Sequence, residues 1–216
     1  MKQLHLILSI LFTVISLQVA HSSILSSDQA TKNSGNNDGL EIATIKVASQ
    51  IYANSCPDDY PETYAIVSLS DMKTYPVDYA IANPRDVDFR FYCFGGNGVP
   101  RLYSMHNTGE GSKENEYKGM AGTLEDMTKR NQTHFLALPD NFDFDNATSE
   151  SISKIDPSSI KLGRIDNVAV GDIIAIRSKK KVGLIKVVDI TAPRALKSND
   201  PTARVITLEI KFPKMK

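Results

Sequence analysis

The stretch VAVGDIIAIRSKKKVGLIKVVDI, Val168–Ile190, decides the fold of this chain, because two apolar runs flank a short lysine-rich tip. The first run, Ile173–Ile176, is apolar at every position, which is typical of a strand covered on both faces. The second run, Leu184–Ile190, has the β-branched content of another strand. A Gly171-Asp172 pair before the first run is a turn signal. We therefore expect a β-hairpin that is scaffold rather than a binding site, with its lysine tip solvated.

The C-terminal segment RVITLEIKF, at 204–212, alternates between apolar and polar residues with the period of a strand. One face of this strand carries Ile206, Leu208, Ile210 and Phe212. Together with the hairpin, the segment predicts an antiparallel C-terminal β-meander.

Two further strands are expected upstream, in TYAIVSL at 63–69 and in DVDFRFYCF at 86–94. The segment that begins at Leu40 fits a helical stripe, but its β-branched residues favour a strand. TLEDMTKRN, at 123–131, is the best helix candidate, because Thr123 and Asp126 have the spacing of a capping box. In the 86–94 segment, alternation places Val87, Phe89, Phe91 and Cys93 on one face and Asp86, Asp88 and Arg90 on the other.

These patterns predict a mostly-β fold, an antiparallel sandwich or small barrel with a C-terminal β-meander and one short helix. Residues 1–22 have the features of a secretory signal peptide: a positive Lys2, an apolar run and small residues near the expected cleavage site. Residues 23–39, rich in Ser, Asn, Asp and Gly, are expected to be a disordered leader. Residues 40–216 then form a single β-rich domain.

The N-terminal pattern predicts a protein that is secreted or periplasmic after signal-peptide cleavage, with a retained N-terminal anchor as the alternative. The apolar run is shorter than the roughly 20 residues of a membrane-spanning helix, and no later stretch is long and apolar enough to span. The chain has 25 basic and 25 acidic residues. This balance argues against a nucleic-acid backbone as the partner.

Cys56 and Cys93 are the only cysteines, and an exported chain meets an oxidising compartment, so the pair is expected to form a disulfide. Closing a loop of this length stabilises a fold by roughly 3 to 4 kcal/mol on the chain-entropy model. Two buried thiols and a catalytic thiol are the alternatives, although no Cys-x-x-Cys pair is present and no histidine is close in sequence.

The hairpin and the last strand, GDIIAIR, GLIKV and ITLEIKF, resemble a C-terminal pattern of exported proteins and lipoproteins in Gram-negative, polysaccharide-degrading bacteria. The upstream order, from AIVSLSD through DVDFRFYCFGG and RLYSMHN to KRNQTHFLAL, is also similar. The resemblance implies the architecture and the export, and it assigns no catalytic residue. The chain departs from the pattern in two ways: it lacks a lipid-anchor cysteine, and its tip is SKKK rather than a glycine-containing turn.

The lysine tip, Lys179, Lys180 and Lys181, with Arg177 before it, is a candidate ligand contact. A solvated hairpin tip is the plain interpretation, and contact with an anionic glycan is the functional one. Nucleic acid is disfavoured, because no aromatic strip for base stacking accompanies the tip. The chain has eight tyrosines, all after the leader, and exposed ones offer stacking surfaces for sugar rings, whereas tryptophan is absent. Those considered are Tyr60, Tyr64, Tyr75, Tyr79, Tyr92 and Tyr103.

The DNFDFDN segment offers Asp140, Asp143 and Asp145 as possible calcium ligands. Asn146 stands where the calcium-loop template has glycine, and Ile152 where it has glutamate, so surface carboxylates are the alternative. His106 and His134 lack zinc-site spacing, and we expect no metal, cofactor or catalytic residue.

NQT at Asn131 and NAT at Asn146 match the glycosylation pattern, which marks surface loops in a eukaryotic host. The acids Glu110, Glu114 and Glu116 leave a hydrolase with a dispersed acidic site open. The function expected from the sequence is a non-catalytic binding or interaction module, with a glycan or another surface protein as partner. A glycan-binding protein and a secreted hydrolase are the alternatives.

Overall fold

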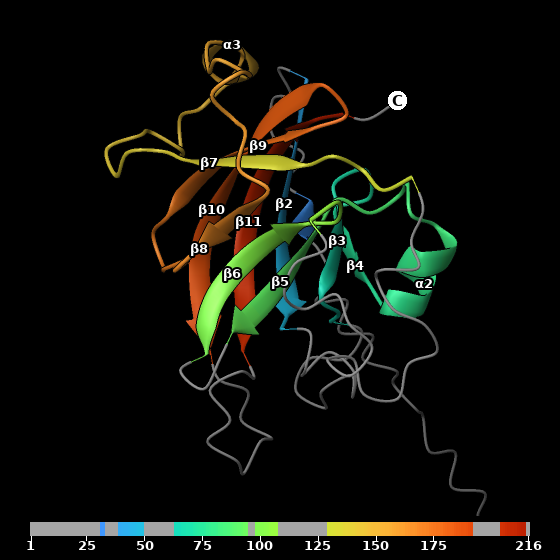
Figure 1. Cartoon of the computed structure of the whole chain (residues 1–216). Helices are drawn as coiled ribbons and strands as arrows, with labels where there is room; N and C mark the ends of the chain where they lie inside the picture. Colours follow the sequence, from blue (N-terminus) through green and yellow to red (C-terminus); the bar gives the residue numbers. More distant parts are fainter. Residues whose placement is uncertain are drawn as a thin grey trace, which may run out of the picture.

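The structure is a computed structural model, and it describes residues 31–32, 39–49, 63–94, 98–107, 129–191 and 204–214. Two antiparallel sheets face each other (Figure 1). Across sheet A the strands run β1 (Thr31–Lys32), β2 (Leu40–Ala48), β11 (Val205–Pro213), β10 (Lys181–Thr191), β9 (Ile173–Ser178) and β7 (His134–Ala137). Across sheet B they run β4 (Lys73–Tyr75), β3 (Ile66–Ser68), β5 (Phe89–Phe94), β6 (Val99–Ser104) and β8 (Arg164–Asp166).

The predicted mostly-β sandwich is confirmed, and in the described part of the chain the two sheets do not close into a barrel. The C-terminal meander is confirmed as well: β9, β10 and β11 are consecutive antiparallel neighbours in sheet A. Within the leader that was expected to be disordered, Thr31–Lys32 forms a two-residue strand against Thr44 and Ala43 of β2.

The main core fills the space between the sheets, and the apolar faces named from the sequence supply much of it. Phe89, Phe91 and Cys93 of β5 pack there against the inward side chains of sheet A. The alternation of the last strand is confirmed, because Ile206, Leu208, Ile210 and Phe212 are all fully buried in this core.

A third layer covers the outer face of sheet A, which explains the continuous apolar run in β9. Ile174 and Ile176 belong to the core between the sheets, whereas Ile173 and Ala175 belong to a second cluster on the other face. The segment 138–160 supplies the cover, with Phe144 and Ile152 among its buried side chains. Both faces of the strand are therefore shielded from water, as the run predicted.

The single predicted helix, 123–131, lies mostly outside the described residues. The described helices are α2 (Val77–Ala82) and α3 (Ser149–Ser153), neither of which was expected. α3 begins at a capping box in which Thr148 and Ser151 exchange side-chain and backbone hydrogen bonds. Figure 1 shows α2 beside sheet B and α3 beyond the end of sheet A. The described residues contain no helix with the length and hydropathy that crossing a bilayer demands.

Candidate functional site

A pocket of about 360 Å³ lies beside the tip of the β9–β10 hairpin. Its lining residues, called the basic pocket here, are Arg130, Asn131, Gln132, His134, Arg177, Lys179 and Lys180. They come from two segments, the approach to β7 and the end of β9 with its turn. Antiparallel pairing of these strands sets His134 opposite Arg177 and so joins the two segments. None of the described lining residues carries a carboxylate.

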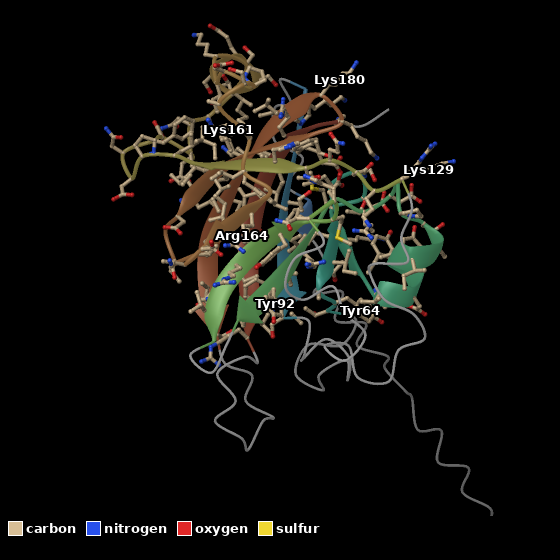
Figure 2. The ribbon with its side chains drawn as sticks, viewed as in Figure 1. Tyr64, Tyr92, Lys129, Lys161, Arg164 and Lys180 are labelled. Atoms are coloured by element: carbon tan, nitrogen blue, oxygen red, sulfur yellow. The ribbon has the colours of Figure 1, made fainter. Side chains whose placement is uncertain are left out.

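The turn itself places two lysines in an unusual backbone conformation. Ser178 pairs with Lys181, which leaves Lys179 and Lys180 as a two-residue loop with φ angles of 48° and 66°. Two successive left-handed residues are the requirement of the type I′ hairpin turn, for which Asn and Gly are preferred. Lysine carries a steric cost in this region because of its Cβ atom. Both lysine side chains are exposed, and Figure 2 shows Lys180 at the outer end of the hairpin.

Only two of the three lysines predicted as a ligand contact therefore line the basic pocket. Lys179 and Lys180 line the basic pocket, and Lys181 does not. The ammonium of Lys181 donates a hydrogen bond to the backbone oxygen of Lys214, next to the C-terminal end of β11.

A buried carboxylate holds the two walls of the basic pocket together. Asp88, which directly precedes β5, is fully buried. Its carboxylate accepts hydrogen bonds from the Ser178 hydroxyl at 2.5 Å, from the Leu69 backbone N–H at 2.8 Å and from the Asn131 amide at 3.3 Å. Burial raises the pKa of Asp88 above 3.8, although these hydrogen bonds and the charge of Lys179 favour the ionised form.

The Asn131 side chain closes one wall of the basic pocket. Its amide nitrogen also donates to the backbone oxygens of Arg85, at 2.8 Å, and of Val87, at 2.9 Å. These contacts occupy the nitrogen to which a glycan would be attached at the first acceptor pattern. Asn146, at the second, is exposed and donates to Asp143 at 2.9 Å.

A chain of hydroxyl groups continues from Asp88 behind the basic pocket to a histidine. Thr133 lies 3.3 Å from Ser178 through their hydroxyl groups, and its backbone N–H donates to the Ser104 hydroxyl at 3.1 Å. Ser104 in turn lies 2.6 Å from Nδ1 of His106. Ser104 is fully buried and His106 is partly buried, so this Ser–His contact lies mostly inside the fold.

The two histidines, which lack metal spacing in the sequence, meet in the structure. The rings of His106 and His134 lie 5.1 Å apart. Burial and the neighbouring His134 lower the pKa of His106, and burial and Arg177 lower the pKa of His134, both below 6.5. At neutral pH both rings are therefore uncharged, and the positive charge of the basic pocket comes from arginine and lysine.

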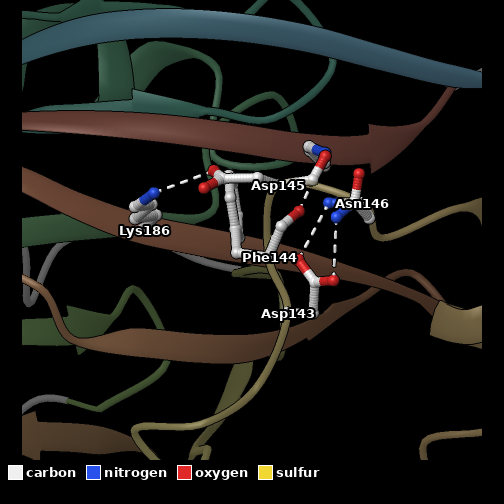
Figure 3. Close-up of polar contacts among 6 residues, drawn as sticks. Asp143, Phe144, Asp145, Asn146 and Lys186 are labelled. Carbon is white, nitrogen blue, oxygen red and sulfur yellow. Dashed lines mark hydrogen bonds and ion pairs between the residues drawn. The ribbon is translucent and has the colours of Figure 1, made fainter.

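The three candidate calcium ligands do not converge on one point. Asp145 forms an ion pair with Lys186 at 2.8 Å, while Asp143 accepts both hydrogen bonds from Asn146, as Figure 3 shows. Asp140 is exposed and lies outside these contacts. The backbone oxygens of Phe144 and Asp145, which a cation could use, accept hydrogen bonds from the buried Lys211. The described residues contain no group of three His, Cys, Asp or Glu side chains placed to hold a metal ion.

Cys93 is buried in the main core, and Cys56 lies outside the described residues, so the disulfide remains a prediction. The acids Glu110, Glu114 and Glu116 also lie outside that part of the chain.

The described tyrosines do not present an open stacking platform. Tyr92 and Tyr103 are buried against each other in an edge-to-face contact at 5.9 Å. Tyr75 and Tyr79 stack on each other at 4.0 Å and are partly buried. Tyr64 is likewise partly buried. The described part of the chain therefore presents charged side chains, rather than open aromatic rings, at the basic pocket.

Sequence reasoning named the lysine tip, with Arg177, as a candidate contact, but it did not connect Arg130, Gln132 or His134 with that tip. The signal was present in two basic stretches, KRNQTH at 129–134 and RSKKK at 177–181. Only the pairing of β7 with β9 brings these stretches to one pocket.

Comparison of the chain with protein-family models, with curated proteins and with solved structures gave no match. The basic pocket, its charge and its geometry therefore carry the functional argument.

Proposed function

We propose that this protein is an exported, non-catalytic binding module whose basic pocket holds an acidic glycan. One observation carries the proposal. Two arginines, two lysines and two side-chain amides from separate segments line a pocket of about 360 Å³. Its described lining contains no carboxylate to oppose an anion. The volume is within the range of small-ligand sites.

The kinds of side chain present suit the acidic groups and hydroxyl groups of a glycan. A guanidinium presents N–H donors in a planar fork that matches a carboxylate or sulfate, so Arg130 and Arg177 can hold acidic groups in a fixed direction. Lys179 and Lys180 act as mobile point charges at the opening. Gln132 is exposed and supplies an amide, which can donate to and accept from sugar hydroxyls.

The strained turn supports a role for the tip in binding. Lys179 and Lys180 occupy left-handed backbone positions that Asn-Gly would adopt at lower cost. Strain of this kind collects at functional sites because the surrounding structure supports it there. Two lysines at these positions therefore agree with a binding function for the tip.

A binding module is favoured over the alternative hydrolase. Most glycosidases use two carboxyl groups on either side of the scissile bond. The basic pocket has none among its described residues, and the nearby Asp88 is fully buried and engaged. Nucleic acid is disfavoured because the chain has balanced charge and its described tyrosines are not open for stacking.

The test is calorimetric titration of residues 23–216 with an oligogalacturonate and with a neutral galactan oligosaccharide of the same length. We expect binding of the acidic oligosaccharide only, weakening as salt rises because the interaction is ionic. Arg177→Gln and Lys179→Gln should each weaken it by about fivefold or more. Lys161→Gln is the matched control, since Lys161 is exposed and outside the basic pocket.

Equal affinity for the acidic and neutral oligosaccharides would overturn the proposal, as would unchanged binding by the Arg177 and Lys179 variants. Tighter binding of single-stranded DNA than of the oligogalacturonate would replace the glycan with a nucleic acid as ligand.

A further inference from the structure

A second hollow also borders the hairpin tip, and its lining is mostly apolar. It has a volume of about 330 Å³ and is called the apolar groove here. Its lining consists of Leu40, Ser149, Ile152, Ser153, Ile155, Pro157, Lys180, Lys181, Val182 and Pro213. These residues come from α3 and the residues after it, from the hairpin tip and the start of β10, and from the ends of β2 and β11. Lys180 is shared with the basic pocket.

The floor of the apolar groove is set by the way α3 packs. The capping box at Thr148 and Ser151 fixes the start of this short helix. Ile152 is thereby buried in the outer core of sheet A, together with Leu40. Ile155 and Val182 pack against the same core and remain only partly buried. Apolar surface is consequently left in contact with solvent along the apolar groove.

Charge in the apolar groove is concentrated on the hairpin tip. Lys180 is exposed, and Lys181 is held by its hydrogen bond to the Lys214 backbone oxygen. The remaining polar groups of the described lining are the hydroxyls of Ser149 and Ser153, and it contains no carboxylate. The lining is thus apolar over most of its length and cationic at one part, the tip.

We infer that the apolar groove binds an alkyl chain with an anionic head group, a fatty carboxylate of medium length. The chain lies along Ile152, Ile155 and Val182, where its methylene groups leave water. The carboxylate lies at Lys180, where the cation offsets its charge. A mostly apolar lining with a few placed polar groups is the usual composition of a small-molecule site. This site is independent of the proposed glycan function, although Lys180 borders both.

The experiment uses residues 23–216 and saturated carboxylates from octanoate to laurate, each below its micelle concentration, in a calorimetric titration. Affinity should rise with chain length, by up to about fourfold for each methylene that is buried. Dodecyltrimethylammonium has an alkyl chain one carbon longer than that of laurate and the opposite charge, and it should bind at least about tenfold more weakly than laurate.

Ile155→Ser should weaken laurate binding by about tenfold or more and leave oligogalacturonate binding unchanged, because Ile155 lines only the apolar groove. Val188→Ser is the control, since Val188 is 43 % exposed on β10 and outside the apolar groove. Arg177→Gln should show the reverse selectivity, losing the glycan and keeping laurate.

Three results would overturn the inference: affinity that does not depend on chain length, equal binding of the cationic amphiphile, or unchanged laurate binding in a folded Ile155 variant. If the Ile155 variant does not fold, the comparison of laurate with dodecyltrimethylammonium on the unmodified chain still decides. If Arg177→Gln loses oligogalacturonate binding and keeps laurate binding, the apolar groove is shown to bind independently of the basic pocket.

Discussion

Asp88 and Arg90 show at the scale of single residues where the sequence pattern is insufficient. Alternation along 86–94 places both on the polar face of their strand, yet both are fully buried. Asp88 is enclosed because the end of β9 and the approach to β7 meet over it. Arg90 is enclosed by Tyr103, whose ring centre lies 5.0 Å from its guanidinium carbon, and by the backbone oxygen of Asn107. A polar face is identified by period, but its burial depends on distant segments.

The buried carboxylate of Asp88 predicts a specific dependence of stability on pH. Its folded pKa is raised above the ordinary 3.8, so folding takes up a proton between the two values. The contribution of Asp88 to stability is therefore greatest below 3.8 and is lost as pH rises through the raised value. The difference in unfolding free energy between wild type and Asp88→Asn should decrease from acid to neutral pH. Urea unfolding across pH measures it; a constant or increasing difference would contradict the assignment.

Gly183 is required by the close approach of β10 to β11. A Cβ atom there would lie 2.3 Å from Cδ2 of Phe212 and 2.6 Å from the backbone oxygen of Lys211. Gly183→Ala should therefore lower the free energy of unfolding by about 1 to 3 kcal/mol or more. Gly163→Ala is the control, because its nearest contact is the Asn107 side-chain amide at 3.3 Å. Urea midpoints of the two variants should differ clearly, and equal midpoints would refute the packing argument.

His134 predicts that anion binding strengthens as pH falls. Burial and Arg177 lower its pKa below 6.5, and His106 is its other close neighbour. A bound anion favours the imidazolium and raises this pKa, so binding takes up a proton. Affinity therefore increases as pH falls through the raised pKa and levels off below the lowered one. His134→Gln should flatten this dependence. Titration with oligogalacturonate checks it, at pH values where the ligand stays ionised, and an affinity that falls with pH would contradict it.

At the scale of elements, the β9–β10 hairpin combines a scaffold with a ligand-facing turn. Lys179→Asn with Lys180→Gly gives the residues preferred in a type I′ turn and should stabilise the fold by about 0.5 to 1 kcal/mol. The same double variant should weaken oligogalacturonate binding, because it removes two cations from the basic pocket. Urea midpoints and calorimetry report the two effects. A lower midpoint would mean that the lysines are not strained.

Substitutions in the strands of the hairpin should lower the stability of the fold much more than substitutions in its turn. Ile174 is buried in the main core, so Ile174→Ala should cost about 2 to 5 kcal/mol. Replacing Lys179, Lys180 and Lys181 with Ser should change stability by much less, since surface changes usually lie within about 0.5 kcal/mol each. Urea unfolding of both variants makes the comparison. Similar losses in the two would show that the tip is structural.

The two described helices escaped the sequence analysis because they are very short. α2 follows Pro76 and has six residues, and α3 has five. Neither is long enough to display a periodic apolar stripe. The start of α3 also does not match the usual capping-box pattern, because Ser151 stands where that pattern has Glu or Gln.

At the scale of the whole molecule, the disulfide between Cys56 and Cys93 is a prediction from the expected export and the number of cysteines. Cys93 lies on β5 and is buried in the core between the two sheets, where a disulfide could tie Cys56 to this core. Protein recovered from an oxidising compartment and denatured without reductant should show no reactive thiol. Removing the bridge by Cys56→Ser should lower the free energy of unfolding by roughly 3 to 4 kcal/mol. Two reactive thiols in freshly secreted material would contradict the pairing.

The sequence by itself determined the mostly-β class, the meander and the cover on both faces of β9, because side-chain alternation and uninterrupted apolar runs are local properties of a strand. It left a sandwich and a small barrel open, and the pairing of the strands in two sheets decided for the sandwich. It also identified the lysine tip. Only the tertiary structure decided that Arg130 and His134 meet Arg177, that Asp88 is buried between them, and that Asp143 and Asp145 turn to different partners. These arrangements depend on which strands pair and in which register. Such pairing joins residues more than forty positions apart, and no local pattern records it.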